Sequence, residues 1–142
     1  MGRYRFVEDV AVADCAIDID GRDLDDVFET AAWALAFLMV DPATVDVTVD
    51  RSIVLEADAL DLLLFDWLSE LIFLKDRDGQ VFTRGQVRVT GAGPFRLDAR
   101  VSGGSLDRTR ARLGADPKAV TFHQFTLDRS GDGWRARVVI DI

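Results

Sequence analysis

Two aspartates stand where their carboxylates could hold a cation. Asp14 lies in an early segment of alternating apolar and acidic residues, and Asp141 precedes Ile142, whose α-carboxylate adds a further anion. If the two segments pair in a sheet, three carboxylates converge, and their repulsion is costly unless a cation lies among them. Ca²⁺ or Mg²⁺ fits this chemistry, because both prefer oxygen ligands and the site needs no imidazole or thiolate. The alternative is that Asp141 is a solvated surface acid, as most acids are.

Lys118 and His123 are further candidates, and both belong to one segment with strand-like alternation. Lysine is rare in this chain, and the ammonium group of Lys118 could contact a phosphate or a carboxylate of a partner. A strand-edge lysine that prevents edge pairing is an equally good interpretation. His123 is flanked by Phe122 and, two residues later, Phe125, which favours a structural or partner-facing role over catalysis, because a general base needs an orienting partner.

Motifs of catalysis are nearly absent. The chain has one histidine and one cysteine, so it offers neither the ligand spacing of a zinc site nor the groups of a nucleophilic triad. The segment Gly91-Ala-Gly93 lacks both the third glycine and the following helix of a phosphate-binding loop. We therefore expect that this protein is not an enzyme.

The charge balance argues against direct binding to nucleic acid. The 142 residues include 25 acids and 17 bases, with a net charge of -8, and a phosphate backbone is repelled by such a surface. Adaptation to a salty cytosol or a coding bias would explain most of the acids as a group. The single cysteine and the absence of an apolar leader predict a cytoplasmic protein, and the apolar stretch 60–74 is too short and too charged to span a membrane.

Hydrophobic periodicity predicts one domain, residues 1–142, of the α+β class. Helical spacing of apolar residues indicates helices over 23–39 and 59–75, and the breadth of the apolar face in the second implies deep burial. The fold expected is a two-layer sandwich, with two helices packed on a mostly antiparallel mixed sheet. Alternation and turn residues place the strands at 5–7, 13–20, 44–56, 80–90, 95–101, 118–128 and 134–142, with a polar loop over 103–116.

Several segments resemble one family over nearly the whole chain. The closing motifs are Lys118-Ala-Val-Thr-Phe-His123, Asp132-Gly-Trp134 and Val138-Val-Ile-Asp-Ile142, and the segment 62–71 resembles the second helix of the same family. On these residues the chain is similar to the archeases. The resemblance implies an accessory protein of the RtcB-type RNA ligase, which joins tRNA halves after intron removal.

The resemblance also implies roles for individual residues. Archeases promote guanylylation and turnover of the ligase and bind a divalent metal, for which the matching positions here are Asp14, Asp141 and Ile142. Lys118 matches a lysine implicated in activation, and His123 belongs to the same strand motif. On this view RNA is touched only indirectly, through the ligase. The competing hypotheses are a metal-dependent phosphoester hydrolase built on the same acids and a non-catalytic binding module or chaperone.

The early metal motif departs from the family pattern. The family has a histidine and a threonine where this chain has Ala11 and Val12, so any role of that imidazole or hydroxyl is lost or supplied elsewhere. An alignment that makes Asp9 the counterpart of the histidine requires a short insertion. The alignment on Asp14 needs no gap and is the one adopted here.

Overall fold

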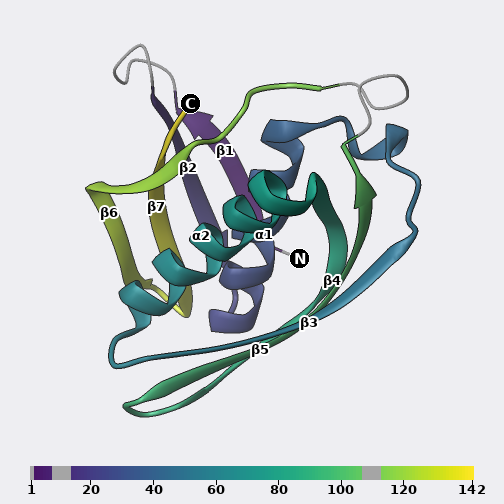
Figure 1. Cartoon of the computed structure of the whole chain (residues 1–142). Coiled ribbons are helices and arrows are strands. Elements are labelled where there is room, and N and C mark those ends of the chain that lie inside the picture. Colours follow the sequence, from purple (N-terminus) through teal and green to yellow (C-terminus); the bar gives the residue numbers. More distant parts are fainter. Residues whose placement is uncertain (1, 8–13, 107–112) are drawn as a thin grey trace.

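The computed structural model describes residues 2–7, 14–106 and 113–142 and forms seven strands and two α-helices (Figure 1). Positions 11 and 12 of the early motif, and the alternative position 9, lie outside the described residues. A short 3-10 helix, η1, spans Pro42–Thr44. The elements in chain order are β1 (Arg3–Val7), β2 (Asp14–Gly21), α1 (Leu24–Met39), β3 (Val49–Ala57), α2 (Leu60–Asp78), β4 (Gln80–Gly91), β5 (Phe95–Ser105), β6 (Ala119–Ser130) and β7 (Gly133–Asp141).

The strands divide into two sheets. The first sheet has the order β1-β2-β7-β6 and the second has the order β3-β5-β4, and every strand pair among the described residues is antiparallel. The α+β sandwich expected from the sequence is confirmed. The single mixed sheet of that expectation is replaced by two antiparallel sheets.

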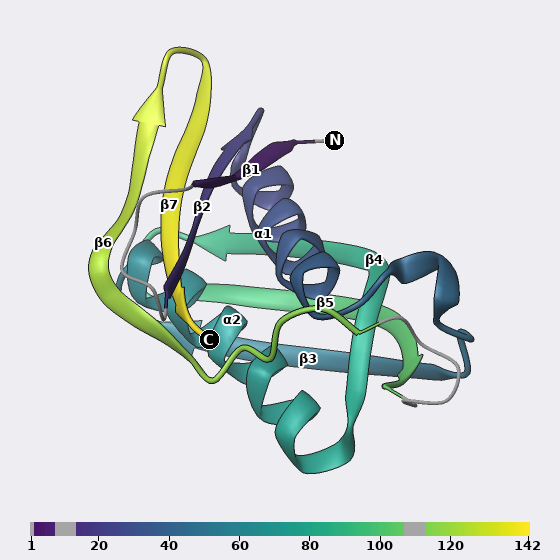
Figure 2. The same cartoon turned by 90° about the horizontal axis from the view of Figure 1, so that it is seen from above.

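The two helices lie between the two sheets and contact both of them (Figure 1 and, seen from above, Figure 2). Helix α1 contacts β1, β2 and β7 on one side and β4 on the other, and it buries Val27 and Phe28 as well as Trp33 and Leu35. A helix that is apolar nearly all round needs a partner on each side. This requirement explains why the strands form two layers instead of one.

The helix termini follow the local chemistry of the sequence. The side chain of Asp23 caps α1 by accepting a hydrogen bond of 2.8 Å from the Asp26 N–H. Helix α2 ends at Asp78 and is capped by Gly79, which has a φ of 64°, a left-handed conformation that glycine adopts without cost. The helix therefore runs one turn beyond the expected end at residue 75. The indole N–H of Trp67 in α2 donates to the Phe28 carbonyl of α1 at 3.0 Å and joins the two helices.

Strand β5 extends through part of the expected polar loop. Gly103 and Gly104 belong to the strand, and β5 is the centre of the second sheet, paired with β3 and β4. A side chain at Gly103 would collide with the carbonyl of Val81 in β4. Glycine is therefore required at position 103 because the backbones of β5 and β4 approach closely there, and not because the segment forms a loop.

Strand β6 contains a wide interruption of its pairing with β7. Thr121 pairs with Val139 and Thr126 pairs with Arg137, so residues 122–125 of β6 lie opposite the single residue Val138. We call this four-residue segment the β6 bulge. Gln124 within it has a φ of 55°, which is uncommon for a residue other than glycine.

The packing of α2 predicts a sharp contrast between two neighbouring leucines. Leu64 is fully buried in the core, whereas Leu62 is exposed. We expect Leu64→Ala to lower the free energy of unfolding by about 2–5 kcal/mol through lost burial and a cavity, and Leu62→Ala to change it by less than about 0.5 kcal/mol. Urea denaturation followed by circular dichroism measures both, and equal losses in the two variants would contradict this packing.

Candidate metal centre at the end of the β2–β7 pair

The strand register places Asp14 directly opposite Asp141. Strands β2 and β7 are antiparallel neighbours, and this pair of residues begins their ladder. Residues directly opposite have Cβ atoms about 4.5–5.5 Å apart and side chains on one face. Ile17 and Ile19 of β2 and Val138 and Ile140 of β7 pack into the core, so by alternation both aspartates lie on the outer face. The strand pairing on which the metal hypothesis depends is therefore present.

Lys118 reaches the same end of the first sheet. Its backbone N–H donates to the carbonyl of Asp141 at 2.7 Å, and the next residue, Ala119, pairs with Asp141 in the β6–β7 ladder. Lys118 is exposed. The end of this sheet thus gathers two carboxylates and a lysine from three adjacent strands or their immediate extensions.

The two carboxylates are chemically suited to an oxygen-binding cation. Both aspartates are half-buried, and neither side chain has a hydrogen-bond or ion-pair partner within residues 2–7, 14–106 and 113–142. Like charges directly opposite each other on two strands repel, and a divalent cation would relieve that repulsion. The described residues do not bring a third His, Cys, Asp or Glu side chain to this pair. Oxygen atoms of Ile142 would have to add to the ligand set.

A buried lysine holds the segment that leads to Lys118. The Lys75 side chain is 7% exposed, and its ammonium group contacts Asp116 at 2.5 Å, Asp76 at 2.7 Å and the carbonyl of Pro117 at 2.6 Å. Burial disfavours the charged form, but the hydrogen bonds to Asp116 and Asp76 outweigh it and raise the pKa of Lys75. Sequence reasoning missed this residue. Its signal was a charged residue on the turn after Leu71, where the buried face of α2 continues.

His123 lies in the β6 bulge. It is exposed and has no side-chain interaction with another of the residues that the structure describes. Its neighbour Phe122 stacks on Phe65 of α2, with ring centroids 4.0 Å apart and an angle of 1° between the rings. The aromatic neighbours that the sequence showed therefore join β6 to α2.

Comparisons with known proteins agree over nearly the full length of the chain. Residues 4–142 match the model of the Archease protein family (MTH1598/TM1083). The chain belongs to the archease family. Protein archease of Methanosarcina mazei is 33% identical over 142 residues, which cover 99% of this chain and 96% of the relative. Protein archease of Thermococcus gammatolerans is 33% identical over 132 residues, which cover 92% and 93% of the two chains.

Solved archease-family structures share this fold. The solution structure of Methanobacterium thermoautotrophicum protein 1598 superposes with a TM-score of 0.79 at 27% identity and covers 98% of each chain. The crystal structure of an archease from Thermotoga maritima, described as a possible chaperone, has a TM-score of 0.64 at 20% identity and covers 97% of this chain and 98% of that one, which shows the fold alone. Within the described part of this archease-family chain, neither helix is long and apolar enough to cross a membrane.

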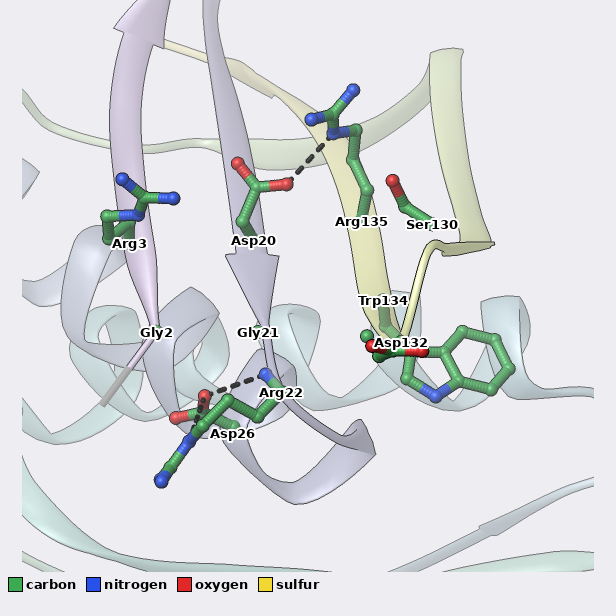
Figure 3. Close-up of a pocket in the computed structure, with 11 residues that line it drawn as sticks. Gly2, Arg3, Asp20, Gly21, Arg22, Asp26, Ser130, Asp132, Trp134 and Arg135 are labelled. Atoms are coloured by element: carbon green, nitrogen blue, oxygen red, sulfur yellow. Dashed lines mark hydrogen bonds and ion pairs between the residues drawn. The ribbon is translucent and has the colours of Figure 1, made fainter.

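The opposite end of the β2–β7 pair forms a cavity that the sequence did not indicate. This cavity of about 430 Å³ is lined by charged residues of both signs (Figure 3). Asp20 pairs with Arg135 at 2.9 Å, and Asp26 accepts a hydrogen bond of 3.0 Å from the backbone of Arg22. Burial opposes ionisation of Asp26, but hydrogen bonds from Arg22 and nearby positive charge outweigh it and lower its pKa. These acids already have partners, whereas Asp14 and Asp141 have none among the residues that the structure describes.

A row of charged residues crosses the outer face between the two ends. Arg137 binds Asp18 through two hydrogen bonds of 2.7 and 2.9 Å, and Arg5 adds a third at 3.3 Å. The hydrogen bond from Arg137 is the main cause that lowers the pKa of Asp18. This row ties β1, β2 and β7 together on the face that carries the candidate metal centre.

The lowered pKa of Asp18 predicts a specific dependence of stability on pH. The ionised carboxylate stabilises the folded chain at pH values above its ordinary pKa of about 3.9, and this contribution is lost as the pH falls through the lower folded value. We expect Asp18→Asn to cost about 1–2 kcal/mol at pH 7, with the difference from wild type shrinking below about pH 4. Urea denaturation at pH values from 7 to below about 4 measures this difference in the free energy of unfolding, with Glu56→Gln as an exposed control. A difference that stays constant with pH would contradict the assignment.

The buried ammonium group of Lys75 predicts local order before β6. Lys75→Met keeps the apolar stem but removes the donors to Asp116 and the Pro117 carbonyl. We expect faster hydrogen exchange at the Lys118 amide, with the centre of β7 unchanged. Lys75→Arg, which retains a cation, is the matched control. Equal protection of the Lys118 amide in wild type and Lys75→Met would show that the contact does not hold this segment.

Proposed function

We propose that this archease-family chain is a non-catalytic activator of an RtcB-type RNA ligase, and that it holds a divalent cation through Asp14, Asp141 and Ile142. The observation that carries the proposal is the cross-strand pair of half-buried carboxylates without partners among the described residues, next to Lys118. The ligase is the partner that the resemblance to the archeases implies. The absence of catalytic motifs supports activation of another enzyme over independent turnover.

The ligand chemistry favours Ca²⁺ or Mg²⁺. Both ions prefer carboxylate and carbonyl oxygens, and Ca²⁺ tolerates an irregular ligand set completed by water. A cation held here would supply electrostatic stabilisation of phosphate oxygens at the active site of the partner. The two aspartates and the main-chain oxygens of Ile142 would be the ligands that this chain contributes to the ion.

Lys118 would act beside this centre as a positioned point charge. The hydrogen bond to Asp141 fixes its backbone, and Lys75 holds Asp116 and Pro117 before it. The position of the Lys118 Cα atom, from which the side chain extends, is therefore defined. A lysine fixed in this way can orient a triphosphate or a carboxylate of the partner without first ordering a loop. The net charge of -8 favours contact with a protein partner over direct contact with RNA.

The first test measures metal binding and ligase activation in the same variants. We expect Asp14→Asn and Asp141→Asn to weaken Ca²⁺ or Mg²⁺ binding by about tenfold or more, because each removes one charged ligand. Nucleotidyl transfer to the ligase should fall in these variants and in Lys118→Ala. Titration followed by NMR and a guanylylation assay provide the two measurements.

Asp132→Asn is the matched control, because Asp132 is an exposed acid in the turn at the other end of β7. Unchanged rates in Asp14→Asn, Asp141→Asn and Lys118→Ala would refute the activation proposal. Turnover of phosphoesters by the isolated protein would favour the hydrolase instead. A binding module without metal would show no shifts at Asp14 and Asp141 during the titration.

A further inference from the structure

An exposed apolar surface spans helix α2 and the β6 bulge. Three of its side chains are strongly exposed: Leu62 by 42%, Phe73 by 48% and Phe122 by 62%. The rings of Phe65 and Phe125 lie next to the ring of Phe122. We call these five residues the α2–β6 surface. Large apolar side chains that gather on one face of a folded protein mark an interaction site more often than isolated ones do.

A groove lies within this surface and opens beside Lys118. Its volume is about 320 Å³, and its walls are Phe65, Ile72 and Phe73 of α2 and the first residues of β6. Lys118 and Asp76 stand at its polar edge. The groove therefore joins the apolar surface to the end of the sheet that carries Asp14 and Asp141.

The β6 bulge keeps Phe122 on this surface. Phe122 stacks on Phe65, and Phe125 meets both rings edge-on at 5.8 and 6.2 Å. The aromatic contacts hold the bulge in a defined shape although four residues there leave the regular ladder. β6 is also an edge strand of the first sheet, and a bulge obstructs the addition of another strand. The surface is thus better suited to a side-chain anchor than to strand pairing.

The charges around the apolar residues indicate what kind of partner fits. Helix α2 carries five acids and two bases, a net charge of -3, and one of the bases, Lys75, is buried against acids. Asp66 is exposed near the aromatic residues, whereas Asp76 already contacts Lys75 at 2.7 Å and Arg77 lies over the Phe73 ring at 5.0 Å. A second copy of this acidic chain, an anionic membrane or RNA would be repelled here, whereas lysine and arginine would be attracted.

We infer that the α2–β6 surface docks a basic segment of the protein that this chain activates. The segment would insert an apolar side chain into the groove between Phe65 and Phe73 and place lysine or arginine near Asp66. This inference rests on the proposed function, since it names the surface through which the activator would hold its partner. Docking here would bring Lys118 to the partner, because Lys118 lines the groove and its N–H bonds the carbonyl of Asp141 at the same end of the first sheet.

The test compares binding with activation, using the purified RtcB-type ligase of the same organism as the probe. We expect Phe73→Ser and Phe122→Ser to raise the Kd by about tenfold or more, as truncated anchors do. Both should reach the wild-type maximal rate of guanylylation at saturating concentration, because the candidate metal centre is intact. Asp66→Lys, a surface change that leaves the apolar packing alone, should weaken binding and reduce its dependence on salt.

Val54→Ser is the matched control, because Val54 is 52% exposed on β3 of the other sheet and should leave the Kd unchanged. Asp141→Asn should show the opposite split, with normal binding and a lower maximal rate. Wild-type Kd values in Phe73→Ser, Phe122→Ser and Asp66→Lys would overturn the docking surface while leaving the proposed function standing. A wild-type chain that neither binds nor activates the ligase would overturn both. Conversion of a wild-type dimer to monomers by Phe73→Ser would assign the surface to self-association instead.

Discussion

The pairing of β2 with β7 is the constraint on which the rest of the candidate site depends. Its register is fixed because Ile17, Ile19 and Ile140 must face the helices, and a shift of one residue would turn these side chains outward. The same requirement places Asp14 and Asp141 together on the outer face. The hydrophobic core therefore determines the geometry of a polar site that lies outside it.

The layer of helices also determines the positions of Lys118 and of the α2–β6 surface. Helix α2 buries one face between the sheets, and from that face Lys75 anchors the residues before β6. From its other side the same helix supplies Phe65 and Phe73. One rigid element thus supports both the approach to the candidate metal centre and the surface beside it, so that their relative position does not depend on a flexible connection.

Sequence reasoning was most accurate where a local pattern has one meaning. Apolar periodicity predicted both helices, and the turn residues predicted the final hairpin. The motifs at the end of the chain indicated the archease family. The division into two sheets could not be predicted, because alternation shows that a residue stretch is a strand but not which strand it joins. Gly103 suggested a loop since close approach to β4 is not visible in the sequence, and the role of Lys75 depended on Asp116, 41 residues away.

The length of the β2–β7 ladder has a practical consequence for handling the molecule. From Asp14 to Gly21 the ladder spans seven residue steps, or about 23 Å, and it ends beside the turn that contains Gly131 and Asp132. That turn is exposed and lies beyond the charged row that separates it from the aspartate pair. A fluorophore or a surface tether attached there would lie at the far end of the ladder from Asp14 and Asp141, whereas the same label near Lys118 would lie beside them.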